Sequence, residues 1–233
     1  MPLTEGYPHP ELLETPEWLA AHLDDTRLKV LDARSATDYG EGHIPGAILL
    51  PSPVFKAEGS PETCSADEFA KLAGGLGVRP SDTVVCYDAQ GTGAARAWWA
   101  FTHFGHAPVR FLHGGWKAWQ AGGYPIEMKP STYPPVDYHQ AHPEAGLACS
   151  LPQAVDALKQ GEVLFWDTRT ADEFSGADPR SNPADRVGHI PRAVHLEWSD
   201  LTDTATGLFK PADEMRRILS AKGITPEKEV VTY

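Results

Sequence analysis

One short pattern of charged and polar residues occurs twice in this chain, in the same order each time. It consists of Asp-x-Arg followed, after a spacer, by Gly-His-Ile-Pro, and its titratable members are Asp32, Arg34, His43, Asp167, Arg169 and His189. Each Asp-x-Arg lies at the end of a short apolar run that predicts a buried strand. The carboxyl ends of parallel strands are where α/β proteins build their sites. These residue types therefore allow either a catalytic role or an internal ion pair that braces a loop.

The recurrence extends well beyond this pattern. Three segments of the first half reappear in the second: Leu31-Asp32-Ala33-Arg34 as Trp166-Asp167-Thr168-Arg169, Gly42-His43-Ile44-Pro45 as Gly188-His189-Ile190-Pro191, and Val84-Val85-Cys86-Tyr87 as Val230-Val231-Thr232-Tyr233. The first pair lies 135 residues apart and the other two lie 146 apart, so the second copy has gained 11 residues between Phe174 and Gly188. Constant offsets on either side of one insertion indicate a duplicated domain.

Each copy alternates short apolar runs with amphipathic stretches. Thr15 before Pro16 predicts one helix start, and Ser65 predicts another. In the first copy we predict strands at 28–31, 83–87 and 109–112, and helices from 16, from 66, over 91–104 and over 116–121. Alternating strands and helices predict an α/β fold in which each copy forms a mainly parallel sheet flanked by helices.

The domain boundaries follow from the repeat. We predict a first domain over 1–128, a proline-rich linker over 129–146, and a second domain over 147–233 that lacks its C-terminal part. Extrapolation along the first copy places about 40 further residues of the second copy beyond Tyr233. We therefore expect either a truncated chain or a chain that stops at a modified cysteine.

The composition restricts the classes of partner. The chain has 233 residues with 32 acidic and 20 basic side chains, which is a net charge of −12 with neutral histidines. An acidic chain without a basic tract is a poor candidate for binding nucleic acid or an anionic membrane. It has no apolar run of about 18 residues, as a transmembrane helix requires. Its N-terminus also lacks the basic and apolar regions of a signal peptide.

The cysteines and histidines predict neither a disulfide framework nor a metal site. Cys64, Cys86 and Cys149 are too few and too scattered for either, and they fit a reducing cytoplasm. The ten histidines show no His-x-x-x-His spacing, so no bound metal is predicted. Cys86 falls inside a predicted buried strand, and we interpret all three cysteines as buried, inert thiols.

Both copies of the pattern, together with Gly114-Gly115-Trp116-Lys117-Ala118-Trp119, resemble the rhodanese family. They resemble specifically its tandem sulfurtransferases, which include thiosulfate and 3-mercaptopyruvate sulfurtransferases. The resemblance covers nearly the whole chain in the family's order. It implies two tandem rhodanese-like domains, of which the first is inert and the second carries a nucleophilic cysteine. It also implies that no metal or organic cofactor takes part.

In that family the nucleophilic cysteine follows the strand that here ends at Tyr233, so it is expected at the next position, beyond this sequence. The repeat reaches the same position, because Tyr87 aligns with Tyr233 and Asp88 aligns with the residue after it. Asp88 opens a strand-to-helix loop whose backbone N–H groups can converge on an anion. A carboxylate there repels an anionic substrate and cannot carry sulfur, so the first copy is predicted to be an inert pseudo-site.

Sulfur transfer requires a thiolate that attacks sulfane sulfur and holds it as a persulfide. The donors are anions, so an acidic protein must provide local positive charge. The insertion contains Arg180 and Arg186 and resembles the segment in which family members place a substrate-binding arginine, with Arg186 the better match. Either arginine could instead be a solvated side chain paired with Asp178 or Asp185. Recurrence in an inert first copy favours structural roles for both Asp-x-Arg pairs and both turn histidines.

The function that we predict is transfer of sulfane sulfur from thiosulfate to cyanide or a thiol acceptor by a cytoplasmic enzyme. Its partners would be a small anionic donor and a nucleophilic acceptor. 3-Mercaptopyruvate is the alternative donor, and a phosphatase of the same fold is an alternative enzyme, distinguished by the length of its active loop. If the chain truly ends at Tyr233, a non-catalytic binding or regulatory protein becomes the better interpretation.

Overall fold

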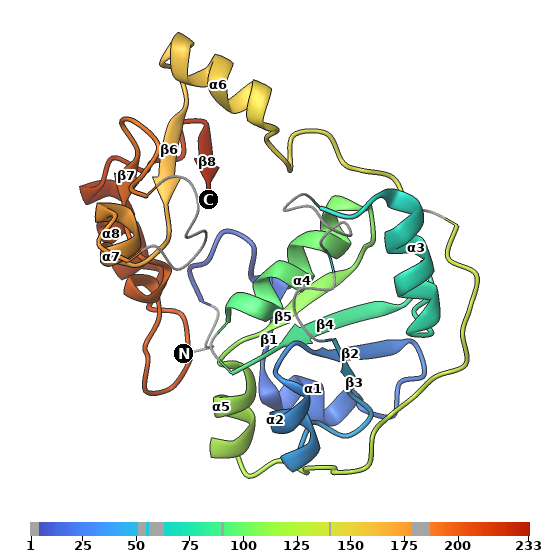
Figure 1. Cartoon of the computed structure of the whole chain (residues 1–233). Coiled ribbons are helices and arrows are strands. Elements are labelled where there is room, and N and C mark those ends of the chain that lie inside the picture. Colours follow the sequence, from blue (N-terminus) through green and yellow to red (C-terminus); the bar gives the residue numbers. More distant parts are fainter. Residues whose placement is uncertain (1–4, 51–54, 56–62, 90, 140, 179–186) are drawn as a thin grey trace. The chain divides into compact units, whose positions relative to one another are not determined.

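A computed structural model describes residues 5–50, 55, 63–89, 91–139, 141–178 and 187–233. The chain divides into two compact units. The first contains residues 1–147 and 205–208, and the second contains residues 148–204 and 209–233. Each unit holds one copy of the repeat, so the two copies can be compared element by element (Figure 1).

The first unit is built on a parallel sheet (Figure 1). From edge to edge its strands are β1 (Leu13–Glu14), β5 (Val109–Leu112), β4 (Thr83–Tyr87), β2 (Leu28–Asp32) and β3 (Ile48–Leu49). β2 and β4 pair along their whole length, from Leu28 opposite Thr83 to Asp32 opposite Tyr87. Asp32 and Tyr87 therefore lie side by side at the carboxyl edge of the sheet, where the candidate site is built.

Helices cover both faces of this sheet. They are α1 (Pro16–His22), α2 (Ala36–Glu41), α3 (Ala66–Gly75), α4 (Thr92–His103) and α5 (Gly115–Ala121), after a short 3-10 helix, η1 (Pro10–Leu12). Figure 1 shows α3 and α4 on one side of the strands and α1, α2 and α5 on the other. Leu19 of α1 and Trp119 of α5 join the buried strand residues in one core cluster. Phe69 of α3 packs against Phe101 of α4 and against Phe104, which directly follows α4, in the other layer.

Local sequence explains where these helices begin. Thr15 Oγ1 accepts the N–H of Trp18 at 3.2 Å before α1, and Ser65 forms a capping box with Glu68 before α3. The structure adds β1, β3 and α2, which the sequence did not predict. A strand of two residues has no periodicity that a pattern could reveal, and α2 is only six residues long.

The second unit repeats the central part of this arrangement. Its described residues form a parallel sheet in the order β7 (Val194–His195), β6 (Leu164–Asp167) and β8 (Val230–Thr232), which corresponds to β3, β2 and β4. Its helices are α6 (Leu151–Gln160), α7 (Ala171–Ser175) and α8 (Ala212–Ala221), with a 3-10 helix, η2 (Trp198–Leu201). Leu196, Leu201 and Ile224 form its buried core. The predicted α/β fold, with parallel sheets flanked by helices, is confirmed in both copies.

Residues 129–147, most of which the sequence predicts as a linker, lie along the surface of the first unit (Figure 1). The N–H of Ser131 donates to the hydroxyl of Tyr39 at 3.1 Å, and the N–H of Val136 donates to the carbonyl oxygen of Gly74 at 2.9 Å. A Cβ atom at Gly74 would lie 2.4 Å from the carbonyl oxygen of Val136, so this close approach requires glycine. The segment is thus attached to the unit through its backbone.

Tyr138 is the buried anchor of this segment. Its hydroxyl lies 2.8 Å from Nδ1 of His106, while Nε2 of the same imidazole lies 2.9 Å from the carbonyl oxygen of Asp82. Burial lowers the pKa of His106, so the ring is neutral near pH 7. A neutral ring in this geometry donates from Nε2 to Asp82 and accepts at Nδ1 from Tyr138.

We expect Tyr138→Phe to lower the free energy of unfolding of the first unit by about 1–2 kcal/mol, because it leaves Nδ1 of a buried imidazole without a donor. Native-state hydrogen exchange of amides in β2 and β4 measures the change. The control is Tyr133→Phe, which removes a hydroxyl that donates to the carbonyl oxygen of Gly46 from a partly exposed ring, and its loss should be smaller. Unchanged protection in Tyr138→Phe would contradict an anchoring role for this residue.

Candidate functional site

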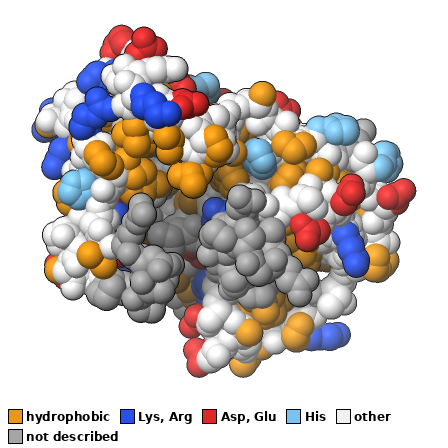
Figure 2. Space-filling view, turned by 45° about the horizontal axis from the view of Figure 1, so that its top comes forward, with side chains coloured by type: hydrophobic (Ala, Val, Ile, Leu, Met, Phe, Trp, Pro, Cys, Tyr) orange, Lys and Arg blue, Asp and Glu red, His pale blue; other side chains and the backbone are white. Residues whose placement is uncertain are grey.

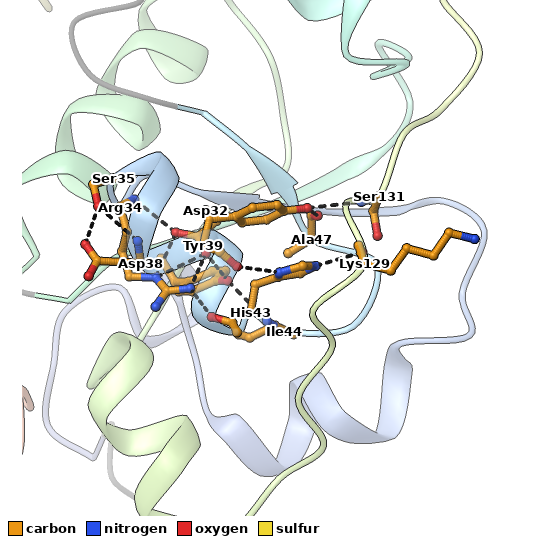
Figure 3. Close-up of polar contacts among 12 residues, drawn as sticks. Asp32, Arg34, Ser35, Asp38, Tyr39, His43, Ile44, Ala47, Lys129 and Ser131 are labelled. Carbon is orange, nitrogen blue, oxygen red and sulfur yellow. Dashed lines mark hydrogen bonds and ion pairs between the residues drawn. The ribbon is translucent and has the colours of Figure 1, made fainter.

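The Asp-x-Arg residues of the first copy form a buried ion pair at the end of β2 (Figure 3). Arg34 Nη2 lies 2.6 Å from Oδ2 of Asp32, and Arg34 Nε lies 3.0 Å from Oδ1. The same Nη2 donates to the carbonyl oxygen of Gly42 at 2.7 Å. The side chains of Asp32 and Arg34 are 0% and 3% exposed, so the pair is shielded from water. The bidentate pair therefore holds the turn that begins at Gly42 against the end of the strand.

A tyrosine from the neighbouring strand completes this network. The hydroxyl of Tyr87 donates to Oδ2 of Asp32 and accepts the N–H of Ile44 at 3.2 Å. Burial raises the pKa of Tyr87, and the adjacent Asp32 carboxylate raises it further, so the phenol stays neutral and available as a donor. The tyrosine thus connects the end of β4 to both the end of β2 and the turn.

The histidine of the same turn has both ring nitrogens engaged (Figure 3). Nδ1 of His43 lies 2.9 Å from the carbonyl oxygen of Tyr39, and Nε2 lies 3.2 Å from that of Lys129. The imidazole stacks on the Tyr39 ring with 3.7 Å between centroids and is fully buried. In the second copy Nδ1 of His189 lies 2.8 Å from the carbonyl oxygen of Phe174. The His189 imidazole stacks on the Phe174 ring, as His43 does on Tyr39. Such contacts hold the turn onto the preceding helix.

The second copy reproduces the ion pair. Arg169 Nη2 lies 2.6 Å from Oδ2 of Asp167 and donates to the carbonyl oxygen of Gly188 at 2.8 Å. Burial alone would raise the pKa of Asp167, but hydrogen bonds from Arg169 and Tyr233 outweigh it and leave the pKa below its ordinary value. The Arg169 side chain is 27% exposed, against 3% for Arg34, so water screens this pair more strongly.

The tyrosine recurs as well. The hydroxyl of Tyr233 accepts the N–H of Ile190 at 2.9 Å and is hydrogen-bonded to the carboxylate of Asp167. We call this group of four residues the strand-end frame: Asp32, Arg34, Ile44 and Tyr87 in the first copy, and Asp167, Arg169, Ile190 and Tyr233 in the second. The role of both tyrosines was not predicted from the sequence, although a tyrosine at the end of each of the two matched strands was a visible signal.

The backbone at these tyrosines is also equivalent. The carbonyl oxygen of Tyr87 accepts the N–H of Ala33 at 2.9 Å, and that of Tyr233 accepts the N–H of Thr168 at 3.1 Å. Both tyrosines are therefore held by the same two attachments, one through the side chain and one through the main chain. In the first copy the residue that follows this tyrosine is Asp88, which opens the loop before α4.

Asp88 occupies the anion-binding position of its own loop. Its carboxylate accepts the N–H of Ala94 at 2.9 Å and also that of Gly91, at the start of α4. These are the N–H groups that the sequence analysis expects to converge on an anion. The loop permits no larger residue at Gly115, where a Cβ atom would lie 2.4 Å from the carbonyl oxygen of Asp88. An internal carboxylate thus occupies the place that an anionic ligand would take.

An open hollow of about 390 Å³ lies beside this loop. Its lining combines two guanidinium groups with two carboxylates and small residues, and consists of Ala33, Arg34, Asp38, Asp88, Ala89, Thr92, Gly93 and Arg96. Arg34 is paired with Asp32, and the Asp88 carboxylate already accepts the loop N–H groups, so neither that guanidinium nor those N–H groups are available to bind a small anion there. This arrangement fits the predicted inert pseudo-site at Asp88.

The remaining predicted residues lie elsewhere. Arg180 and Arg186 fall outside the described residues. Cys86 and Cys64 are buried, and burial raises the pKa of both thiols, that of Cys86 more strongly. Cys149 is exposed, and the expectation of a buried thiol is wrong for it, because it precedes α6 on the surface of the second unit.

Within the described ranges, no three His, Cys, Asp or Glu side chains are grouped closely enough to hold a metal ion. The same part of the chain contains no helix with the length and apolar character needed to cross a bilayer.

Comparison with known proteins identifies relatives over both copies. A family model described as a rhodanese-like domain matches residues 15–122 and 150–233. The sulfur carrier protein TtuD of Thermus thermophilus is 32% identical over 244 residues, covering 98% of this chain and 84% of that protein. A thiosulfate sulfurtransferase of Corynebacterium glutamicum is 34% identical over 248 residues, covering 100% of this chain and 79% of that protein.

Solved structures show the same fold. SseA from Escherichia coli, described as a 3-mercaptopyruvate sulfotransferase with the rhodanese fold, is 27% identical with a TM-score of 0.85, covering 95% of this chain and 87% of that one. Wild-type EanB is 20% identical with a TM-score of 0.87, covering 97% of this chain and 60% of that one. At that identity the second likeness concerns the fold alone.

Proposed function

This chain belongs to the family of rhodanese-like domain proteins, and from that premise we propose that it is a thiosulfate sulfurtransferase. It moves sulfane sulfur from thiosulfate to cyanide or a thiol acceptor through a cysteine persulfide. The observation that carries the proposal is the strand-end frame around Tyr233, which repeats the frame that delivers Asp88 to the loop in the first copy. The nucleophilic cysteine is proposed at the position after Tyr233, equivalent to Asp88.

The chemistry follows from that position. A residue there opens a loop of the kind in which Gly91 and Ala94 aim their N–H groups at the side chain of Asp88. Such N–H groups would lower the pKa of a thiol and stabilise its thiolate. The thiolate attacks the outer sulfur of thiosulfate, the S–S bond of the donor breaks, and sulfite leaves with the bonding electron pair. Cyanide or a thiolate then attacks the outer sulfur of the persulfide and releases the enzyme thiolate.

The donor must be attracted to a protein with a net charge of −12. We propose Arg186, and secondarily Arg180, as the source of local positive charge, because a guanidinium offers paired donors to sulfonate or carboxylate oxygens. 3-Mercaptopyruvate is the second candidate donor, which the likeness to SseA supports. Steady-state kcat/KM for the two donors, measured on the same preparation, distinguishes them. The three free cysteines fit the reducing cytoplasm that we propose as the place of action.

The test uses a polypeptide that continues past Tyr233 and carries Cys64→Ala, Cys86→Ala and Cys149→Ser. We expect it to transfer sulfur from thiosulfate to cyanide at a rate within about twofold of the unsubstituted protein, because none of the three cysteines is the nucleophile. Alkylation by iodoacetamide should abolish transfer in both proteins. Thiocyanate formation measures the rate, and peptide mass spectrometry locates the added sulfur after incubation with thiosulfate.

Cys149→Ser alone is the matched control, since this exposed residue can be replaced without disturbing a core. A persulfide on Cys149, or loss of transfer in this single variant, would refute the proposed position of the nucleophile. Absence of alkylation-sensitive transfer from either donor in the unsubstituted protein would refute the sulfurtransferase and favour a non-catalytic rhodanese-like protein.

A further inference from the structure

We propose that His103 is a pH-sensitive attachment point for residues 141–147, here called the linker end. While its imidazole is neutral, the linker end is held against the C-terminal turn of α4, and protonation of the ring releases it. Every contact involved lies within the first unit, so this role does not depend on the proposed function. The linker end itself is mostly exposed and contains neither helix nor strand.

Two main-chain hydrogen bonds attach the linker end to the C-terminal turn of α4. The N–H of Glu144 donates to the carbonyl oxygen of His103 at 2.6 Å, and the N–H of His142 donates to that of Phe104 at 3.2 Å. The last carbonyl groups of a helix have no partner within the helix, so they can accept these donors. The linker end thus completes the hydrogen bonding at the end of α4.

A pair of stacked rings on α4 makes the third attachment. Trp99 Nε1 donates to the carbonyl oxygen of Leu147 at 2.9 Å. The His103 imidazole stacks on the Trp99 ring, with 5.0 Å between the centroids and 4° between the planes. Because residues 142–147 are all exposed, hydrogen bonds rather than apolar burial hold the linker end. Movement of the His103 ring would therefore disturb the bond between Trp99 and Leu147.

Protonation of His103 requires such a movement. The residue is 9% exposed, and within the part of the chain that the structure describes its Nδ1 is buried without a hydrogen-bond partner. A neutral ring therefore carries its proton on Nε2 and leaves the lone pair of Nδ1 unused. Acid adds the second proton at Nδ1, where the new N–H has no acceptor. A charged donor left unsatisfied inside the protein is costly, so the ring must turn toward water.

The charged groups of the two elements do not remove this cost. Burial lowers the pKa of His103 and outweighs the Glu144 carboxylate, which favours the charged ring. The other titratable groups of α4 and the linker end are Arg96 and His142. Both are cations when charged, so neither stabilises a protonated imidazole. The guanidinium of Arg96 already lies 5.0 Å from the centre of the Trp99 ring.

The direction of the pH dependence follows from proton linkage. A histidine whose pKa is lowered in the attached state binds fewer protons there than after release. The attachment is therefore fully present above about pH 6.5, the ordinary pKa of histidine, and weakens as the pH falls below it. Uptake of one proton limits the change to about tenfold per pH unit. Release leaves Tyr138 as an anchor and frees more chain before the second unit.

Hydrogen exchange of the 233-residue chain, expressed as protection factors at single sites, tests this role. We expect the protection factor of the Glu144 amide to fall by about three- to tenfold between pH 7.5 and pH 5.5. The indole N–H of Trp99 should lose protection in parallel. His103→Phe keeps a ring on Trp99 but takes up no proton, so both sites should stay within about twofold.

The chain has ten histidines, and Figure 2 shows such side chains (pale blue) at the surface, so acid charges more than one imidazole. The matched control is His142→Asn, which removes the exposed imidazole of the linker end and keeps its main-chain bond. This variant should show the same fall in protection as the unsubstituted chain. An equal fall in His103→Phe would overturn the proposal, because release would then belong to another group, such as His106 at Tyr138.

A second variant separates release from tightening by an ion pair. Glu144→Gln removes the carboxylate that favours the protonated ring, so its loss of protection at pH 5.5 should exceed that of the unsubstituted chain. A smaller loss would mean that acid strengthens a bond between Glu144 and His103, which overturns the proposal. Protection of the Glu144 amide that stays constant or rises as the pH falls would overturn it as well.

Discussion

Asp32→Ala should destabilise the first unit by about 3–5 kcal/mol, because it leaves a buried guanidinium without its counter-charge. The side chain of Arg34 is 3% exposed, and Asp32 accepts hydrogen bonds from both Nε and Nη2. The substitution also removes the acceptor of the Tyr87 hydroxyl. The backbone N–H of Arg34, its Nε–H and the hydroxyl of Tyr87 then lose their acceptor at once within a buried network.

The second copy is the matched control. Asp167→Ala, made in the 233-residue chain, removes the same carboxylate from the same pattern, but the Arg169 side chain is 27% exposed in this chain and can be solvated by water. Its loss should therefore be smaller, about 1–3 kcal/mol. Urea denaturation with hydrogen exchange of strand amides in each unit measures both changes. Equal losses in the two units would contradict the argument that burial sets the cost.

Asp88→Cys should convert the inert loop of the first copy into a reactive thiol. The introduced sulfur would face the N–H groups of Gly91 and Ala94, which now hydrogen-bond to the Asp88 carboxylate. Thiols in such surroundings have pKa values of about 3.5–7.5, against about 8.5 for a free cysteine. At pH 7 we expect the introduced thiol to be alkylated at least tenfold faster than Cys149, on the order of the increase in its thiolate fraction.

Two internal references make this comparison interpretable. Cys86, two residues earlier on β4, is fully buried with a raised pKa and should remain unreacted, which shows that the unit is folded. Asp88→Ser has nearly the same shape as the cysteine variant and should gain no reactivity. Mass spectrometry after limited iodoacetamide treatment identifies the modified peptide. If the introduced thiol reacts no faster than Cys149, the loop N–H groups do not stabilise an anion at this position, and the pseudo-site interpretation is wrong.

Much of the local architecture could be predicted from the sequence. The duplication was visible because it needs only the order of residues along the chain. The α/β class and the ends of the central strands were visible because each depends on residues close together in the chain. The Asp-x-Arg pairs belong to this group, since Asp32 and Arg34 are two residues apart and share one loop. The same spacing brings Asp167 to Arg169, so both pairs form from local geometry alone.

Other features were decided by tertiary structure. Ile44 and Tyr87 are 43 residues apart, as are Ile190 and Tyr233, and only the pairing of neighbouring parallel strands brings each hydroxyl to its turn. The segment 129–146 was predicted to be a linker because prolines interrupt its periodicity. Tyr138 contacts Phe69 of α3 and His106 of the segment after α4, both distant in the chain, so the sequence pattern contains no sign of its attachment.

The sequence by itself thus determined that the chain contains two copies of one domain and that Asp88 stands where a nucleophile is expected in the second. Only the tertiary structure decided that the Asp88 carboxylate occupies the N–H groups of its own loop and that a tyrosine hydroxyl connects each strand end to its turn. The physical reason is that a repeat is a property of the order of residues, and that the end of a strand follows from residues close together in the chain. Hydrogen bonds between strand ends and turns form only after the sheet has assembled.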